Sequence, residues 1–118
     1  MERERGHYLG TEIDGKWYKR YRHDGLFARG LGDCWIDCDV LRFLRYLTRT
    51  PLTIPLRRVH AVELGKWHAG RWVGTKRAIK LIWERDGKQL SSGFVFTRTA
   101  PEAVRRAGAL RELISSFR

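Results

Sequence analysis

A short basic, tryptophan-rich segment in the middle of the chain holds the residues best suited to chemistry, and that chemistry is binding. Trp67 and Trp72 are amphipathic rings of the kind that suits a membrane interface or a groove on a protein. Cations surround them, and each cation near an anionic surface contributes about 1 kcal/mol to association. The ligand-binding residues predicted in this segment are Lys66, Trp67, His68, Arg71, Trp72, Lys76 and Arg77.

The same segment has a second interpretation. Large aromatic side chains on loops are usually at least half buried, so Trp67 and Trp72 would fold back over the body of the domain. The cations would then be merely solvated. Gly65, Gly70 and Gly74 indicate an exposed loop or a wide hairpin here, because glycines punctuate regular structure.

Catalysis has little support, because no set of residues fills the roles that a reaction needs. The chain lacks a Gly-x-Ser-x-Gly sequence, a phosphate loop and a His-Glu-x-x-His sequence. Cys34, Cys38, His60 and His68 are the conceivable zinc ligands, but their spacing matches no zinc motif. The two cysteines are expected to be reduced thiols. The prediction is a protein without enzymatic activity, metal or cofactor.

Composition favours a polyanionic partner. The 118 residues suit one domain, and 42% hydrophobic with 31% charged residues is typical of a soluble globular protein. The formal charge of +11 suits membrane surfaces or nucleic acid. It also suits a basic surface that only keeps the domain soluble. No apolar run reaches the roughly 18 residues of a membrane span, and no secretory signal is evident. We therefore expect a cytoplasmic location, with peripheral contact at the membrane.

Alternating residues and turn signals predict a chain of strands closed by one helix. Residues 1–10 are expected to form a flexible lead-in, and 11–118 a single domain. Asp14-Gly15, Asp24-Gly25 and Asp86-Gly87 indicate turns. Thr99 and Glu102 form a capping box that starts the helix. The predicted strands are 16–22, 32–37, 41–46, 58–64, 77–84 and 89–97, followed by a helix over 101–117.

The same patterns select the core. Side chains that share one face of a strand, or one stripe of the helix, are expected to pack together. The predicted core residues are Ile36, Leu41, Phe43, Val59, Ile79, Leu81, Trp83, Phe94, Phe96, Val104, Leu110, Ile114 and Phe117.

The order of these elements resembles that of the bacterial pleckstrin-homology-like and GRAM-like domains. The resemblance is carried by Leu41-Arg42-Phe43, by Ile54-Pro55-Leu56 and by the alternating strand from Val59 to Glu63. A hairpin over 79–96 and the terminal amphipathic helix complete it. It covers residues 17–117.

This resemblance implies a mainly β (α+β) fold, in which two roughly orthogonal antiparallel sheets form a partly open barrel. About seven strands are expected, with a C-terminal α-helix capping the barrel. Relatives bind membrane phosphoinositides or other lipids in some cases and protein segments in others, which implies a non-enzymatic binding or adaptor module. Eukaryotic lipid-binding relatives place basic residues on and between their first two strands. Here that region holds Lys16, Lys19, Arg20, Arg22 and Arg29, of which Lys19, Arg20 and Arg22 join the predicted ligand-binding residues.

The expected partners are therefore an anionic phospholipid surface or a protein. Sequence-independent nucleic-acid binding is the alternative, because Trp or Tyr rings beside Arg stack on bases. Addition of a peptide strand at a barrel edge is a third interpretation. Pro51 and Pro55 weaken one edge for that purpose, since proline cannot donate a ladder hydrogen bond.

Overall fold

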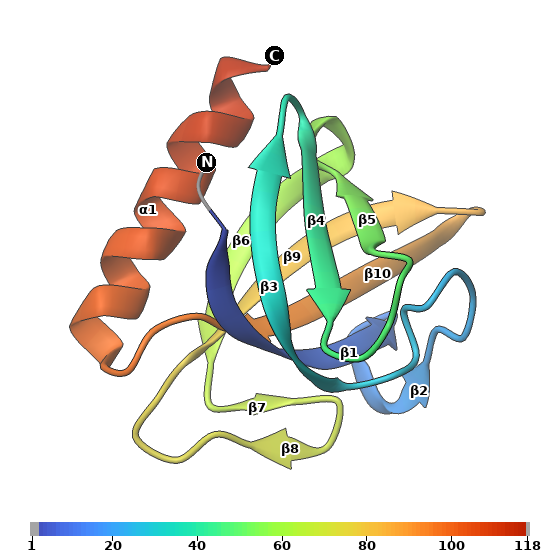
Figure 1. Cartoon of the computed structure of the whole chain (residues 1–118), viewed down its shortest axis with the longest axis horizontal. Helices are drawn as coiled ribbons and strands as arrows, with labels where there is room; N and C mark the ends of the chain where they lie inside the picture. Colours follow the sequence, from blue (N-terminus) through green and yellow to red (C-terminus); the bar gives the residue numbers. More distant parts are fainter. Residues whose placement is uncertain (1–2, 118) are drawn as a thin grey trace.

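Antiparallel strands form one long sheet that bends across itself, with a helix along one side (Figure 1). The computed structural model describes residues 3–117. In chain order the elements are β1 (Glu4–Ile13), β2 (Lys16–Arg20), β3 (Gly30–Asp37), β4 (Val40–Arg45), β5 (Leu52–Pro55), η1 (Leu56–Arg58), β6 (Val59–Gly65), β7 (Trp67–His68), β8 (Arg71–Trp72), β9 (Ala78–Arg85), β10 (Lys88–Val95) and α1 (Ala100–Ser116).

Seven strands follow one hydrogen-bonded path, in the order β5-β4-β3-β1-β10-β9-β6, and β2 pairs beside β1. In Figure 1, β3 and β5 point up the page, β4 points down between them, and the three strands cross in front of β9 and β10. Within the described residues the path does not close, because β5 and β6 stay at its two ends. The predicted architecture, a partly open barrel of crossing antiparallel sheets with a C-terminal helix, is confirmed. β7 and β8 form a separate two-stranded sheet.

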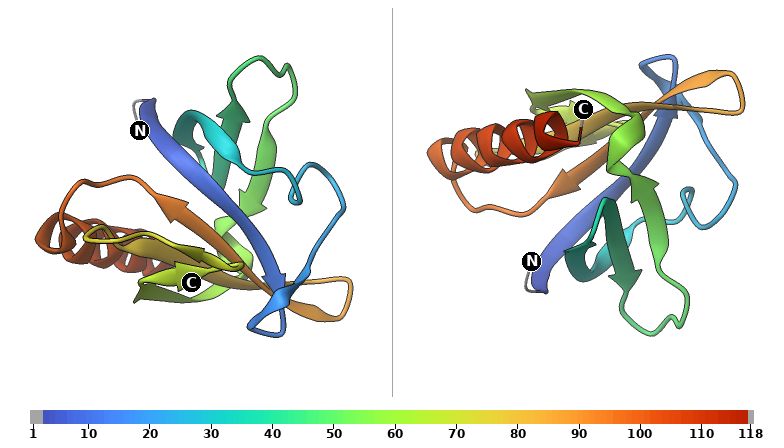
Figure 2. Two further views of the ribbon diagram at one scale, coloured as in Figure 1. Left: turned by 90° about the horizontal axis from the view of Figure 1, so that it is seen from below. Right: turned by 90° about the horizontal axis from the view of Figure 1, so that it is seen from above.

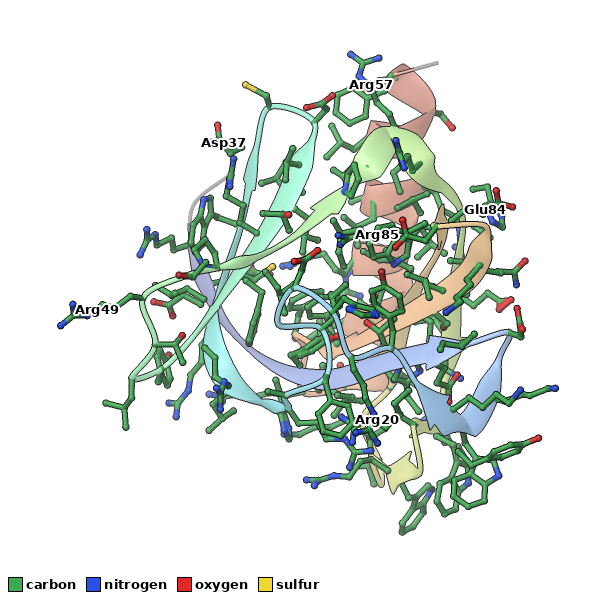
Figure 3. The ribbon with its side chains drawn as sticks, turned by 90° about the vertical axis from the view of Figure 1, so that its right-hand side faces the viewer. Arg20, Asp37, Arg49, Arg57, Glu84 and Arg85 are labelled. Carbon is green, nitrogen blue, oxygen red and sulfur yellow. The ribbon has the colours of Figure 1, made fainter. Side chains whose placement is uncertain are left out.

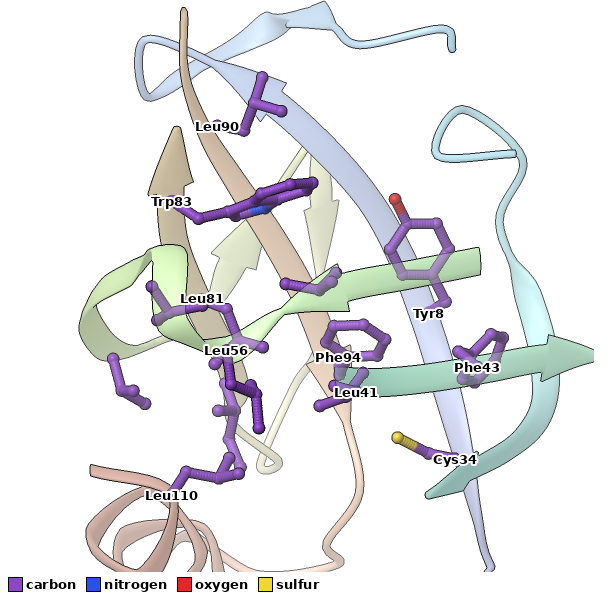
Figure 4. Close-up of a cluster of buried hydrophobic side chains, with 14 of the residues drawn as sticks. Tyr8, Cys34, Leu41, Phe43, Leu56, Leu81, Trp83, Leu90, Phe94 and Leu110 are labelled. Atoms are coloured by element: carbon purple, nitrogen blue, oxygen red, sulfur yellow. The ribbon is translucent and has the colours of Figure 1, made fainter. Parts of the chain in front are cut away.

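Aromatic rings fill the centre of the barrel (Figure 4). The rings of Tyr8, Phe43 and Phe94 lie with centroids 5.2 to 5.8 Å apart. The hydroxyl of Tyr8 donates to the carbonyl oxygen of Leu26 at 2.5 Å, which ties the long β2–β3 connection to the core. Burial raises the pKa of Tyr8 well above its usual range, so the hydroxyl remains a donor.

Most of the predicted core is confirmed. The fully buried members are Leu41, Phe43, Val59, Ile79, Leu81, Trp83, Phe94, Leu110 and Ile114. Ile36, Phe96 and Phe117 are partly buried and pack against that cluster. Val104 was wrongly predicted, since 56% of its surface is exposed. The buried stripe of α1 is Ala103, Ala107, Leu110 and Ile114, and Val104 lies about 100° round the helix from Ala103.

The helix begins where the capping box predicts and lies along β6. The backbone N–H of Glu102 donates to the Thr99 hydroxyl at 3.3 Å, and Pro101 occupies the first turn. Arg111 donates from two guanidinium nitrogens to the carbonyl oxygen of Val62, at 2.6 and 3.2 Å. These bonds attach the polar edge of the helix to β6.

The N-terminal strand is the main difference from the sequence prediction. Residues 1–10 were expected to be a flexible lead-in, but Glu4–Ile13 forms β1, which pairs with both β3 and β10. The domain therefore includes residues 4–10, while Met1 and Glu2 lie outside the described residues. A shift of register between Tyr8 and Gly10 breaks the alternation on which the prediction relied. The next predicted strand, 16–22, pairs only as far as Arg20.

Two glycine substitutions test the packing of this sheet. At Gly32, an alanine Cβ would lie 2.2 Å from the carbonyl oxygen of Leu44, so Gly32→Ala should lower the free energy of unfolding by about 1–3 kcal/mol. At Gly108 in α1 a Cβ meets nothing within 4 Å, so Gly108→Ala should raise it by about 1 kcal/mol. Urea denaturation of both variants measures these changes. Loss of stability in both, or in neither, would contradict the geometry.

Candidate ligand-binding surface

The segment between β6 and β9 folds into a small hairpin made of β7 and β8. Its turn residues, Ala69 and Gly70, have φ angles of +49° and +82°, which is the type I′ geometry of a two-residue hairpin. Trp67 pairs with Trp72, and His68 pairs with Arg71. Because side chains alternate along a strand, the two tryptophans share one face, and His68 and Arg71 share the other.

His68 attaches this hairpin to the outer face of the main sheet. The side chain is only 1% exposed, and its Nε2 donates to the carbonyl oxygen of Gly10 at 2.9 Å. Its ring presses against Gly93 on β10, where a Cβ would lie 2.3 Å from Cδ2. Gly93 pairs in regular register with β9 and lies opposite Gly10, beside the bulge of β1, and its bare Cα makes room for the imidazole. His68, a predicted ligand-binding residue, is therefore a structural residue.

Two charged side chains hold the hairpin turn from either side. The carboxylate of buried Glu12 accepts the backbone N–H of Ala69 at 2.7 Å. The guanidinium of Arg29 donates to the carbonyl oxygen of the same residue. The carboxylate also lies 3.6 Å from Nδ1 of His68. Burial nevertheless lowers the pKa of His68, with Glu12 opposing this shift only in part.

A second, smaller apolar cluster lies beneath the hairpin. Val73 packs against Leu9, Ala78 and Val95, which point outward from β1, β9 and β10. The sheet is therefore covered on both faces near the hairpin, and the hairpin has a defined position on it.

Four aromatic side chains are left exposed beside each other, and we call them the aromatic face: Trp17, Tyr18, Trp67 and Trp72. Each exposes 60 to 64% of its surface. The ring of Trp17 lies over the hairpin turn, 3.5 Å from the position of a Cβ on Gly70. It also meets the ring of Tyr18 edge-on, with centroids 5.6 Å apart. Figure 3 shows rings gathered at one edge of the molecule, over β2 and the hairpin.

The sequence left open whether Trp67 and Trp72 are exposed or fold back over the domain, and the structure shows them exposed. Trp67 and Trp72 do not fold back over the barrel, because His68, on the opposite face of the hairpin, is the side chain that is buried against the sheet. Trp17 and Tyr18 were not among the predicted site residues. Their signal was present, since both lie in a stretch where cations surround the aromatic residues and offer them no apolar neighbours.

The predicted cations are divided between two places. Lys66, Arg71, Lys76 and Lys19 are exposed on or next to the segments that carry the aromatic face. Arg77 is half-buried and donates to the carbonyl oxygen of Lys76 at 3.0 Å.

Arg20 and Arg22 instead gather around Phe27. Their guanidinium carbons lie 4.2 and 4.7 Å from the ring centroid. Arg20 also donates to the carbonyl oxygen of Phe27, so it fastens the β2–β3 connection. Of these two predicted ligand-binding residues, Arg20 has a structural role.

The described residues give little support for metal binding or for a reactive thiol. Within residues 3–117, no three His, Cys, Asp or Glu side chains gather closely enough to hold a metal ion. Cys34 and Cys38 are free thiols, and burial raises the pKa of Cys34 to about 12, which keeps its proton in place. None of the helices in the described part of the chain has the length and apolarity to cross a membrane.

The free energy of unfolding should fall in acid because of two histidines, buried His68 and half-buried His7. Burial lowers the pKa of His68, and burial with the charges of Arg71 and Lys76 lowers that of His7, from an ordinary value of 6.5. The unfolded chain therefore binds more protons below about pH 6.5, and stability present above that pH is lost as the pH falls. We expect a smaller free energy of unfolding at about pH 5.5 than at about pH 7.5.

The variant His68→Gln isolates the contribution of one histidine. Glutamine keeps an N–H donor for the Gly10 carbonyl but does not titrate, so the difference between the two pH values should shrink. His60→Gln, which removes an exposed histidine on β6, is the matched control. An undiminished difference in His68→Gln, measured by urea denaturation, would contradict the role given to its burial.

Comparison with known proteins agrees with this fold. A search of curated proteins finds no match. A family model described as Bacterial PH domain-like matches residues 1–108. Domains of this kind are in general non-catalytic binding modules that mediate lipid or protein interactions. Because the match spans nearly all of the 118 residues, the chain belongs to the bacterial PH domain-like family.

Proposed function

We propose that this domain is a non-enzymatic module that docks on an anionic membrane surface through its aromatic face. The observation that carries the proposal is the gathering of Trp17, Tyr18, Trp67 and Trp72 on two neighbouring hairpins, each ring more than half exposed. A folded domain rarely leaves so many large rings together in water without a partner. Tryptophan and tyrosine prefer the boundary between lipid headgroups and acyl chains.

Charge around the aromatic face suits a membrane of anionic lipids. Exposed cations lie on the same segments, and at about 1 kcal/mol each they would together supply on the order of 5 kcal/mol. The cations concerned are Lys16, Lys19, Lys66, Arg71 and Lys76. That energy corresponds to weak, reversible attachment, which insertion of the rings would strengthen. Salt should weaken it, because exposed charges are screened over about 10 Å at 0.1 M.

The position of the aromatic face favours a flat partner over a groove. In Figure 1, β2 and the β7–β8 hairpin both lie along the lower edge of the molecule, away from the end where the C-terminus lies. Figure 2 shows the hairpin outside the barrel rather than within its opening. Single-stranded nucleic acid remains the second candidate, since exposed rings beside cations also stack on bases.

Sedimentation with vesicles tests the proposal. The protein should pellet with vesicles of phosphatidylcholine containing phosphatidylglycerol, but not with phosphatidylcholine alone. Its tryptophan fluorescence should shift to the blue on binding, because the rings leave water. Absence of binding to both kinds of vesicle would overturn membrane docking, and saturable binding to single-stranded DNA would then favour the second candidate.

A variant with Trp17→Ala, Trp67→Ala and Trp72→Ala assigns the contact to the aromatic face. We expect its affinity for anionic vesicles to fall by about tenfold or more, while its fold is retained because the three rings are exposed. Leu47→Asn is the control, since Leu47 is a fully exposed apolar residue with φ +66° in the β4–β5 turn, a conformation that asparagine tolerates. Figure 3 shows that turn, which bears Arg49, on the far side from the rings. Equal binding by the triple variant and the wild-type protein would exclude the aromatic face.

A further inference from the structure

A cavity of about 600 Å³ opens on the outer face of the sheet, between β1, the end of β10 and the segment that carries the hairpin. Outward-pointing Leu9 and Val95 form part of its apolar lining, and Trp72 and Val73 border it from the hairpin side. His7 stands in it, paired across the sheet with Leu31 on β3 and Val95 on β10. The volume is in the range of small-ligand sites.

Positive charge converges on this cavity from three separate parts of the chain. Its cationic lining residues are Arg5 on β1, Arg71 and Lys76 around the hairpin, and Arg98 after β10. None of the described residues that line it is acidic. The ion pairs formed elsewhere, within residues 3–117, use other arginines: Arg42, Arg57, Arg85 and Arg106. Arg5 has a partner of another kind, the ring of Tyr46 at 5.9 Å.

The charges act on the histidine between them. Burial lowers the pKa of His7, and the positive charges of Arg71, Lys76 and Arg29 lower it further. Four cations held around one partly apolar hollow repel each other, and that repulsion is relieved when an anion enters.

We propose that this cavity is a binding site for a phosphate group carried by a small ester. Guanidinium groups bind phosphate oxygens in pairs of charge-assisted hydrogen bonds, while the lysine contributes a point charge. The apolar lining from Leu9 and Val95 would hold the carbon part of the ester. Two sources share this chemistry, a phospholipid headgroup and a soluble phosphate ester. The site does not depend on membrane docking, because a soluble ester can fill it in water, and Trp72 is the one member of the aromatic face in its described lining.

Titration with glycerol 3-phosphate tests the site directly. The ring resonances of His7, followed by nuclear magnetic resonance, should shift in a saturable manner, and its pKa should rise as the phosphate offsets the surrounding cations. Arg5→Gln with Arg98→Gln should weaken binding by about tenfold or more, since both guanidinium groups line the cavity and would donate charge-assisted hydrogen bonds to the phosphate. Both side chains are exposed, so the fold should be retained.

The matched control removes the same charge elsewhere. Arg58→Gln with Arg105→Gln changes two exposed arginines, on η1 and α1, that do not line the cavity. Its affinity for glycerol 3-phosphate should stay within about twofold of the wild-type value, because distant exposed charges are screened. An equal loss in both double variants, or no saturable shift of His7, would overturn the proposal.

Vesicles containing phosphatidic acid distinguish the two sources of phosphate. If the ligand is a lipid headgroup, Arg5→Gln with Arg98→Gln should reduce vesicle binding more than Arg58→Gln with Arg105→Gln does, because neither Arg5 nor Arg98 is among the cations assigned to membrane docking. If it is a soluble ester, both double variants should bind vesicles alike while only the first loses glycerol 3-phosphate. Trp17→Ala with Trp67→Ala leaves the described lining of the cavity unchanged and should bind glycerol 3-phosphate normally, so failure of membrane docking would not be mistaken for failure of this site.

Discussion

The contact of His68 with Gly93 fixes the hairpin on the outer face of the sheet, and the positions of both the aromatic face and the cavity depend on it. The imidazole fits where β10 offers no side chain, donates to the Gly10 carbonyl and lies beside the carboxylate of Glu12. Without this contact the aromatic face would lose the proximity of Trp17 to the hairpin turn. The cavity would lose the wall that contains Trp72. The buried, hydrogen-bonded His68 therefore determines where the hairpin lies on the sheet. Val73 adds apolar contacts with Leu9, Ala78 and Val95.

Strand β1 connects the interior of the domain to its outer face. Tyr8 turns inward to Phe43 and Phe94, whereas Arg5, His7 and Leu9 turn outward to the cavity and the small apolar cluster. This is possible because successive side chains of a strand point to opposite faces of the sheet. The strand at the centre of the sheet thus faces the core on one side and the cationic cavity on the other. The bulge at Leu9 changes its direction where the hairpin begins to cover it.

Turn and capping residues in the sequence were sufficient to predict most of the strands and the helix. Asp14-Gly15 and Asp86-Gly87 both adopt the positive φ angles expected of such turns, and Thr99 caps α1 as its spacing with Glu102 predicts. The order of strands led to the correct architecture. β1 was missed because its glycines and its bulge interrupt the alternating pattern that identifies strands, and its burial comes from partners far along the chain.

The site was predictable only in part, for a related reason. The basic, tryptophan-rich segment was located from composition, but the direction of each side chain follows from the two-residue turn and from the slot at Gly93. His68 looked available for a ligand because nothing nearby in sequence shows that Gly10, Glu12 and Gly93 surround it. The cavity likewise joins Arg5, Arg71 and Arg98, which are brought together by strand pairing rather than by spacing.

The pairing of β1 with β10 also determines when the fold can form. His7 lies opposite Val95, so β1 lacks one of its pairing partners until the last strand is present. During synthesis from the N-terminus, residues 4–13 must remain without that partner while more than half of the domain is made. Such long-range pairing slows folding, because closing a long loop costs entropy before the stabilising contacts between the strands have formed. Charged residues and glycines disfavour the pairing of exposed strands between chains. Glu4, Arg5, Gly6 and Gly10 should therefore limit association of this unpaired segment until β10 is made.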